Sequence, residues 1–239
     1  MEKLKVYAVC SLSLICIFLF GGLLYGAFNY DESVAVMAES SVKHVIVIDA
    51  GHGGEDGGAS ANGLLEKDIN LSIALKLRDM LTISGYQVLM TRDSDVSIYD
   101  SSSGTTREKK VSDLKNRVKM INSDKGNILV SIHQNKFEQS QYFGTQMFYS
   151  KNNAKSAVLA EELRKSVTGF LQPDNKRELK QADSSIYILD KAQVPAVIVE
   201  CGFLSNEDEA KKLSDNDYQQ KMAFSIYSGI IGYMNKGRM

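Results

Sequence analysis

The sequence lacks any excess of positive charge. Its 28 lysine and arginine residues are balanced by 29 aspartate and glutamate residues, which leaves a formal net charge of −1. Nucleic-acid-binding domains usually carry a clear basic excess, and no block of like charge occurs along this chain. The composition therefore argues against a nucleic-acid partner and identifies no other partner by charge alone.

Cysteine is also scarce. The chain has three cysteines, and two of them, Cys10 and Cys16, lie inside an apolar segment near the amino terminus. Cys201 is therefore alone in the remainder of the chain, which excludes an intrachain disulfide there. We expect Cys201 to be a small buried side chain of the core.

A long hydrophobic run lies between residues 6 and 28 and contains no charged residue. As a helix it would be about 35 Å long, enough to cross a bilayer. Lysines precede it and acidic residues follow it, which favours a cytoplasmic amino terminus. We expect residues 1–28 to be a signal-anchor, or a signal peptide cleaved near Ala38, followed by a polar spacer at 29–43. In either case residues 44–239 are exported, as a membrane-anchored or secreted domain.

The remaining sequence suits one globular domain, since 44% of the chain is hydrophobic and 24% is charged. Short β-branched runs alternate with longer segments that repeat apolar residues at helical spacing. Strands are predicted at 44–49, 86–91, 127–133, 144–150, 185–189 and 195–203, and helices at 66–84, 107–124, 152–170 and 215–235. This alternation predicts an α/β domain with a mostly parallel central sheet flanked by helices on both faces.

Titratable side chains follow three of the predicted strands at their carboxyl ends. His52 comes three residues after the strand residue Asp49, His133 ends the strand at 127–133, and Glu200 ends the apolar run "AVIVE". Ligands of open α/β sheets bind beyond the carboxyl ends of the strands. We therefore expect His52, His133 and Glu200 to share one site.

The loop that carries His52 reads "DAGHGGEDGG" and is rich in glycine. An isolated histidine near a strand end is more often an ordinary hydrogen-bonded residue than a ligand. Here the flanking glycines remove side-chain bulk and permit positive φ, which lets the ring point into the crevice. A phosphate-binding loop is excluded, because the Gly-Lys-Ser/Thr of a Walker loop is absent and Asp56 stands where the dinucleotide fingerprint needs its third glycine.

Two histidines at strand ends together with an acid form the usual protein ligands of a catalytic zinc ion. His44 is the remaining histidine, and it opens its strand at the opposite end. The predicted third ligand is Glu66, at the start of the helix 66–84. Taken alone, a glutamate there is explained by the helix dipole. Beside two histidines we interpret Glu66 as a ligand, and we expect one zinc ion per chain.

Glu200 is then free for acid–base chemistry. Packed against apolar side chains of the sheet, its carboxyl group is expected to have a raised pKa, in the range useful for proton transfer. We assign it as the general base on the zinc-bound water and then as the acid to the leaving amine. Since zinc lowers the pKa of bound water from about 15.7 to about 7, the sequence predicts zinc-dependent hydrolysis.

Four motifs in order resemble those of the zinc-dependent N-acetylmuramoyl-L-alanine amidases, the amidase-3 family: "VIVIDAGHGGEDGGA", "GLLEKDINL", "NILVSIHQN" and "VPAVIVECGFLSN". The resemblance covers about residues 44–235. It implies that His52, Glu66 and His133 bind zinc and that Glu200 is catalytic, in agreement with the reading of the residues themselves. It also implies cleavage of the amide between the lactyl group of muramic acid and the first L-alanine of the peptidoglycan stem peptide.

Within this family the chain is most similar to the germination-specific amidases of endospore formers, because it is small, has an amino-terminal anchor and shows no wall-binding repeats. This resemblance implies a spore-cortex substrate, a place between the forespore membranes and a role in preparing muramic δ-lactam formation. An anchored hydrolase without a targeting module is also expected to need a protein partner that activates or localises it.

Substrate-binding residues are less sharply indicated. Asn135 is expected either to orient backbone near the zinc or to form a turn. Candidates for contacts with stem-peptide carboxylates are Lys176, Arg177 and Lys180, although a solvated loop is the ordinary setting of such residues.

Two other functions compete with a zinc amidase. A catalytically idle module with the same fold would bind peptidoglycan without releasing stem peptides. A cysteine peptidase would use Cys201, but no histidine lies near it in the sequence, and both strand-end histidines are better used on zinc.

Overall fold

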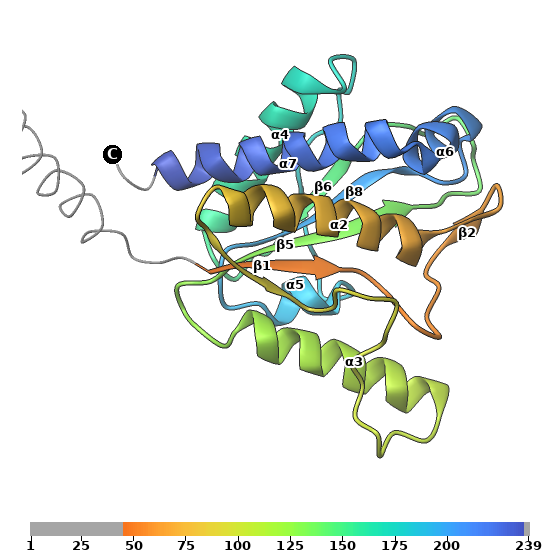
Figure 1. Cartoon of the computed structure of the whole chain (residues 1–239), viewed down its shortest axis with the longest axis vertical. Helices are drawn as coiled ribbons and strands as arrows, with labels where there is room; N and C mark the ends of the chain where they lie inside the picture. Colours follow the sequence, from red (N-terminus) through yellow and green to blue (C-terminus); the bar gives the residue numbers. More distant parts are fainter. Residues whose placement is uncertain (1–44, 237–239) are drawn as a thin grey trace, which may run out of the picture. The chain divides into compact units, whose positions relative to one another are not determined.

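The computed structural model describes residues 45–236, and its centre is a six-stranded sheet in the order β4-β1-β5-β8-β6-β7 (Figure 1). The strands are β1 (Val45–Ala50), β4 (Gln87–Met90), β5 (Ile128–Asn135), β6 (Gln146–Tyr149), β7 (Lys180–Gln181) and β8 (Ala196–Phe203). Every neighbouring pair is parallel except β6 and β8, which are antiparallel. The prediction of a mostly parallel sheet is confirmed.

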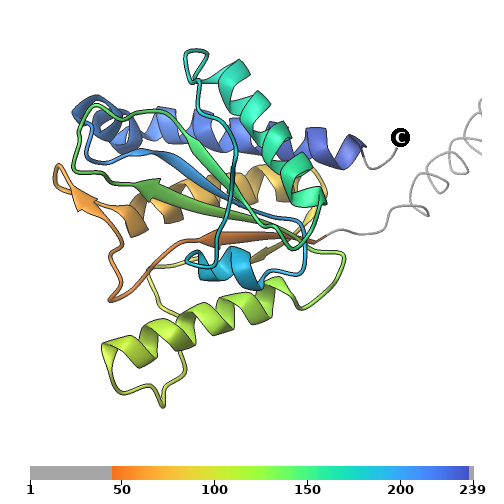
Figure 2. The same cartoon turned by 180° about the vertical axis from the view of Figure 1, so that it is seen from behind.

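Helices cover both faces of the sheet, as predicted (Figure 1, Figure 2). One face carries α2 (Glu66–Ile83), α4 (Lys155–Phe170) and α7 (Asn216–Lys236), and the other carries α3 (Thr106–Ile121) and the short α5 (Tyr187–Lys191). Successive side chains of β1 therefore enter different cores: Ile46 and Ile48 pack on the α2 side, and Val47 packs on the α3 side. Burial on both faces explains why the central strands are continuous apolar runs.

The strand predicted at 185–189 is wrong, because a short helix, α5, forms there instead. It follows a turn in which Asp183 accepts hydrogen bonds from the backbone N–H and the hydroxyl group of Ser185. The apolar side chains of α5 are buried in the core on the α3 side. An apolar run of this length does not by itself distinguish a buried strand from a helical turn. The outermost strand beside β6 is β7 instead.

Two further elements have no counterpart among the predicted ones. The first is a hairpin of β2 (Ser60–Ala61) and β3 (Leu64–Leu65), and the second is the helix α6 (Glu207–Ser214). The hairpin turns at Asn62 and Gly63, which have φ of 50° and 75°, as a tight Asn-Gly turn requires. Because β3 leads directly into α2, the hairpin delivers Glu66 to the carboxyl end of the sheet.

The predicted amino-terminal segments lie outside the described residues. They are the signal-anchor or signal peptide at 1–28, the spacer at 29–43 and the strand start at His44. Across residues 45–236, no helix combines the length and the apolar character that a membrane crossing needs. Anchoring and export therefore stay predictions.

Candidate active site

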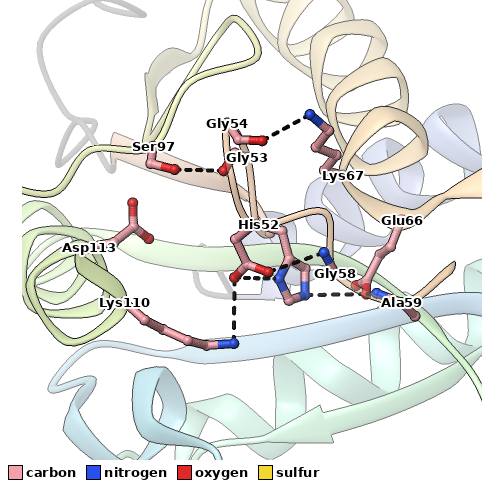
Figure 3. Close-up of polar contacts among 12 residues, drawn as sticks. His52, Gly53, Gly54, Gly58, Ala59, Glu66, Lys67, Ser97, Lys110 and Asp113 are labelled. Atoms are coloured by element: carbon pink, nitrogen blue, oxygen red, sulfur yellow. Dashed lines mark hydrogen bonds and ion pairs between the residues drawn. The ribbon is translucent and has the colours of Figure 1, made fainter. Parts of the chain in front are cut away.

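The three residues predicted as metal ligands lie close together at the carboxyl end of the sheet. Figure 3 shows two of them, His52 and Glu66, facing each other. His52 follows β1, His133 lies in β5 and Glu66 begins α2. His52 Nε2 is 3.2 Å from Glu66 Oε2, and His133 Nδ1 is 2.9 Å from Glu66 Oε1. One nitrogen or oxygen atom from each residue lies within 4.8 Å of the other two. The three side chains are thus close enough to share a metal ion.

His52 has a left-handed backbone conformation, with a φ of 62°. This conformation is unfavourable for residues other than glycine and needs support from its surroundings. Arg117 on α3 donates to the carbonyl oxygens of His52 (2.7 Å) and Ala50 (2.9 Å). Arg92 donates to the carbonyl oxygens of Ala50 (2.9 Å) and Gly51 (3.1 Å). Two arginines from other elements therefore hold the loop that aims His52.

Arg117 is itself held by a buried ion pair. Its Nη1 atom is 2.7 Å from Asp49 Oδ1, and both side chains are almost completely buried. Burial alone would raise the pKa of Asp49, but the charge of Arg117 and a hydrogen bond from Ser131 lower the pKa to about 2. The pair is therefore charged at neutral pH, and it fixes α3 against β1 beneath the site.

Glu66 is the acceptor at the centre of the site. It is 3% exposed, and it accepts hydrogen bonds from the backbone N–H groups of Ala59 (2.7 Å) and Gln134 (3.1 Å). Burial would raise the pKa of this carboxyl group, but hydrogen bonds and charge from His133 and His52 hold the pKa well below its usual range. Glu66 is therefore an ionised carboxylate that faces two imidazoles.

Two glycines leave the space that these side chains occupy. A Cβ atom on Gly51 would lie 2.2 Å from His133 Cε1, and one on Gly58 would lie 2.6 Å from Glu66 Oε2. Real side chains do not approach this closely. The ring of His133 and the carboxylate of Glu66 therefore pack directly against glycine backbone, which fixes where their donor atoms lie.

The donor set fits a zinc ion. Two imidazoles and one carboxylate are ligands found in catalytic zinc sites. Burial lowers the pKa of His52, but hydrogen bonds with Asp56 and Glu66 outweigh burial and raise the pKa to about 9. The carboxylates that favour a proton on His52 also favour a divalent cation in its place, because metal and proton compete for the same nitrogen.

Glu200 lies on β8 beside these residues. Its Cα pairs with that of His133 in the β5–β8 ladder. Its Oε2 atom is buried and has no hydrogen-bond partner within residues 45–236. Burial raises the pKa of Glu200 to about 7, as the sequence predicts. A carboxyl group with a pKa near neutrality can accept a proton and return it.

A cavity of about 210 Å³ opens against His52 and His133. Its walls come from the loop after β1, from the segment that contains Tyr99, and from charged residues of α3, namely Lys109, Lys110, Asp113 and Arg117. Figure 3 shows Lys110 and Asp113 facing the loop of His52. A substrate that enters this cavity reaches both histidines.

The residues predicted to bind substrate lie outside this cavity. Asn135 ends β5, and Arg177 lies beside the end of β8, with its guanidinium carbon 4.5 Å from the ring centroid of Phe203. Lys176 is exposed, and Lys180 lies in the edge strand β7. The structure does not bring these residues into the group around Glu66, and their contact with substrate stays a prediction.

Asp56 and Asn70 belong to the site although neither was predicted there. Asp56 Oδ2 is 3.0 Å from His52 Nδ1. Asn70 Nδ2 donates to Gly51 O (3.1 Å) and to Glu66 Oε1 (3.3 Å). Both carried a signal in the sequence: Asp56 is an acid in the glycine loop of His52, and Asn70 lies one helical turn after Glu66.

Cys201 is a buried, free cysteine on β8. Burial raises the pKa of its thiol well above the usual range. A thiol in such surroundings is inert, because the thiolate is the reactive form. The prediction of a small buried side chain is confirmed, and a cysteine peptidase finds no support.

Comparison with known proteins gives a consistent result. A family model described as N-acetylmuramoyl-L-alanine amidase matches residues 46–232. The germination-specific N-acetylmuramoyl-L-alanine amidase of Bacillus subtilis (strain 168) is 36% identical over 196 residues, which cover 80% of this chain and 80% of that protein. The matched range of the family model contains His52, Glu66, His133 and Glu200.

Solved structures show the same likeness. The CwlD amidase from Clostridioides difficile, in complex with the GerS lipoprotein, is 45% identical with a TM-score of 0.77, over 80% of this chain and 98% of that chain. The N-acetylmuramoyl-L-alanine amidase AmiC2 of Nostoc punctiforme is 29% identical with a TM-score of 0.70, over 82% of this chain and 99% of that chain.

Proposed function

This chain belongs to the amidase-3 family of N-acetylmuramoyl-L-alanine amidases, and on that premise we propose that it is a zinc enzyme of the spore cortex. The family match and the similar amidases make it an N-acetylmuramoyl-L-alanine amidase that acts on peptidoglycan. The proposal adds the metal, the roles of four residues and the type of wall.

The observation that carries the proposal is the convergence of His52, Glu66 and His133 beside Glu200, whose Oε2 atom is buried. The first three residues would hold one zinc ion. Bound zinc supplies a Lewis acid for the amide carbonyl and lowers the pKa of water. The cavity against the two histidines supports the proposal, because it gives a substrate access to the same point.

Glu200 is the residue proposed to move the proton. With a pKa of about 7 it is partly ionised at neutral pH and accepts a proton from the attacking water. The water oxygen bonds to the amide carbon, and the C–N bond to L-alanine breaks as Glu200 returns the proton to the amine nitrogen. The products are a lactyl carboxylic acid, which releases its remaining proton to solvent at neutral pH, and a stem peptide with a free amino terminus.

The substrate extends in two directions from the site, since the amide joins a glycan to a peptide. The cavity between His52 and α3 is proposed to hold one of these two parts of the substrate. The candidates for contact with the other part lie near the end of β8 and at β7: Asn135, Lys176, Arg177 and Lys180.

The cortex assignment is supported by similarity to the germination-specific amidase of Bacillus subtilis. In this proposal the enzyme removes stem peptides from muramic acid and so prepares δ-lactam formation. Export with residues 6–28 as an anchor or signal would place the catalytic domain, residues 44–239, between the forespore membranes.

Metal content and reaction products test the proposal together. The purified protein is expected to hold one zinc ion per chain, to lose activity with a chelator and to regain it with zinc. On purified cortex, mass spectrometry is expected to detect stem peptides that begin with a free L-alanine, with less product from vegetative wall. Hydrolysis by a metal-free preparation contradicts the zinc role, equal turnover of both walls contradicts the cortex role, and binding without product identifies an idle module.

The enzyme is also proposed to work with a protein partner. The similar CwlD amidase was solved in complex with the GerS lipoprotein, and a lipoprotein would localise an exported amidase at a membrane surface. Adding a lipoprotein of this kind from the same cells is expected to raise kcat/KM on cortex fragments by about tenfold, a coupling of about 1.4 kcal/mol. Full turnover by the amidase alone argues against this requirement.

A further inference from the structure

The two histidines of the site are held in different ways. His133 faces Glu66 with its Nδ1 atom, and its ring rests on Gly51, where a Cβ atom would lie 2.2 Å away. His52 faces Glu66 with its Nε2 atom (3.2 Å), and its Nδ1 atom is 3.0 Å from Asp56 Oδ2. Both rings pack against glycine backbone, since a Cβ atom on Gly58 would lie 2.7 Å from His52 Cδ2. The difference is that the second ring nitrogen of His52 has its own partner, Asp56.

The bond to Asp56 decides which nitrogen of His52 keeps its proton when a metal displaces the proton of the other. An ionised carboxylate accepts hydrogen bonds and donates none, so the Nδ1 atom must be the donor. The Nε2 atom is then the one with a lone pair available for a metal. It is also the atom that faces Glu66.

Asp56 is itself fixed by its loop. Its backbone N–H and carbonyl group exchange hydrogen bonds with those of Gly53 (3.1 and 2.9 Å), and its Oδ1 atom accepts from the N–H group of Gly58 (3.1 Å). One carboxylate oxygen is therefore anchored to the loop, and the other reaches His52. Lys110 Nζ lies 3.5 Å from this second oxygen, at the wall of the cavity.

We propose that Asp56 is a positioning residue of the metal site, whose carboxylate holds the His52 ring with Nδ1 protonated and Nε2 presented to the metal. This inference rests on the proposed zinc function and adds to it a residue that binds no metal itself. Because Lys110 contacts the same carboxylate from the cavity, Asp56 also joins the metal site to the space where substrate enters.

Zinc affinity, measured by competition with a chromophoric chelator, tests the role without relying on activity. Asp56→Ala is expected to bind zinc about 10- to 100-fold more weakly than the wild type. Asp56→Asn keeps an acceptor oxygen, so a smaller loss of about threefold is expected. Asp95→Ala is the matched control, because Asp95 accepts from Gly54 N–H (2.8 Å) in the same loop and pairs with Lys67 rather than with a histidine. Its zinc affinity is expected to match that of the wild type.

A second readout reports on the ring directly. In the zinc-loaded wild type, the Nδ1 proton of His52 is expected to be protected from exchange and visible by NMR. In zinc-loaded Asp56→Ala this proton is expected to exchange with water and disappear. A residue that merely shaped the loop would leave the proton visible.

The outcomes distinguish the role of Asp56 from the proposed zinc function on which it rests. A wild type that binds no zinc overturns the proposed function. A wild type that binds zinc, together with an Asp56→Ala protein of equal affinity, overturns only the role of Asp56. Should Asp56→Ala fail to fold, Asp56→Asn decides: weaker zinc binding at an unchanged melting temperature supports the role, and wild-type affinity overturns it.

Discussion

Replacement of Glu200 by glutamine is expected to lower kcat by about 10²- to 10⁴-fold and to leave the zinc content unchanged. Glutamine has nearly the same shape, but it cannot take a proton from water at neutral pH. Zinc is retained because the donor group consists of His52, Glu66 and His133, without Glu200. Turnover of cortex muropeptides and metal analysis of the same preparation measure both effects. A wild-type kcat in this variant would show that Glu200 takes no part in the reaction.

The same substitution is expected to stabilise the metal-free fold at alkaline pH. Burial raises the pKa of Glu200 from 4.5 to about 7, so the folded state keeps a proton that the unfolded state releases. Wild-type stability therefore falls as the pH rises through this window and stays lower above it. The penalty is about 3 kcal/mol, at about 1.36 kcal/mol per pKa unit. Glu200→Gln should gain this amount at pH 8 and gain nothing at pH 4.

Glu209→Gln is the matched control for stability. Burial also raises the pKa of Glu209, but its oxygens accept hydrogen bonds from the N–H groups of Gly144 (3.0 Å) and Phe203 (2.8 Å). Glutamine replaces one of these acceptors by a donor, so this variant is expected to lose stability and to keep its kcat. Urea denaturation with chelator at both pH values compares the proteins. If Glu200→Gln is no more stable than the wild type at pH 8, the ionised carboxylate of Glu200 does not destabilise the folded protein.

Replacement of Glu66 by alanine is expected to abolish zinc binding and to reduce hydrolysis to background. The change removes one of three ligands. It also leaves the N–H groups of Ala59 and Gln134 without the acceptor they have in the wild type. The free energy of unfolding of the metal-free protein should therefore fall by about 2 kcal/mol. Zinc titration and urea denaturation measure the two losses separately.

Asp68→Ala distinguishes a ligand role from a helix-dipole role for Glu66. Both acids lie in the first turn of α2, but Asp68 is exposed. An effect on the helix dipole is worth about 0.3–1 kcal/mol and should be similar for the two alanine variants. If both variants keep zinc and lose the same small stability, Glu66 is an ordinary helix-start acid and the proposed metal site fails.

The sequence located well those residues whose position follows from lying at the carboxyl end of a strand. His133 and Glu200 each end an apolar run, and His52 follows one closely. Parallel strands buried on both faces bring their ends to one edge of the sheet. Glu66 needed the two histidines as context, because acids are common at helix starts for another reason. The Asn-Gly turn that delivers Glu66 was readable as a hairpin signal.

The features that the sequence located poorly depend on local backbone angles or on ambiguous short runs. Asp56 reaches His52 only because the intervening loop closes on itself through Gly53, a geometry that no periodicity encodes. At 185–189 five residues were too few to separate a strand from a helical turn, and the turn at Asp183 decided for the helix.

Gly51 differs from Gly53, Gly54 and Gly58, which have positive φ. Its backbone would suit any residue, so volume alone rules out every other amino acid there. A design that transfers these site residues to another parallel sheet must first provide a strand end at which one position can be glycine. The choice of imidazoles and carboxylates comes second, because the His133 ring fits only where the neighbouring residue has no Cβ atom.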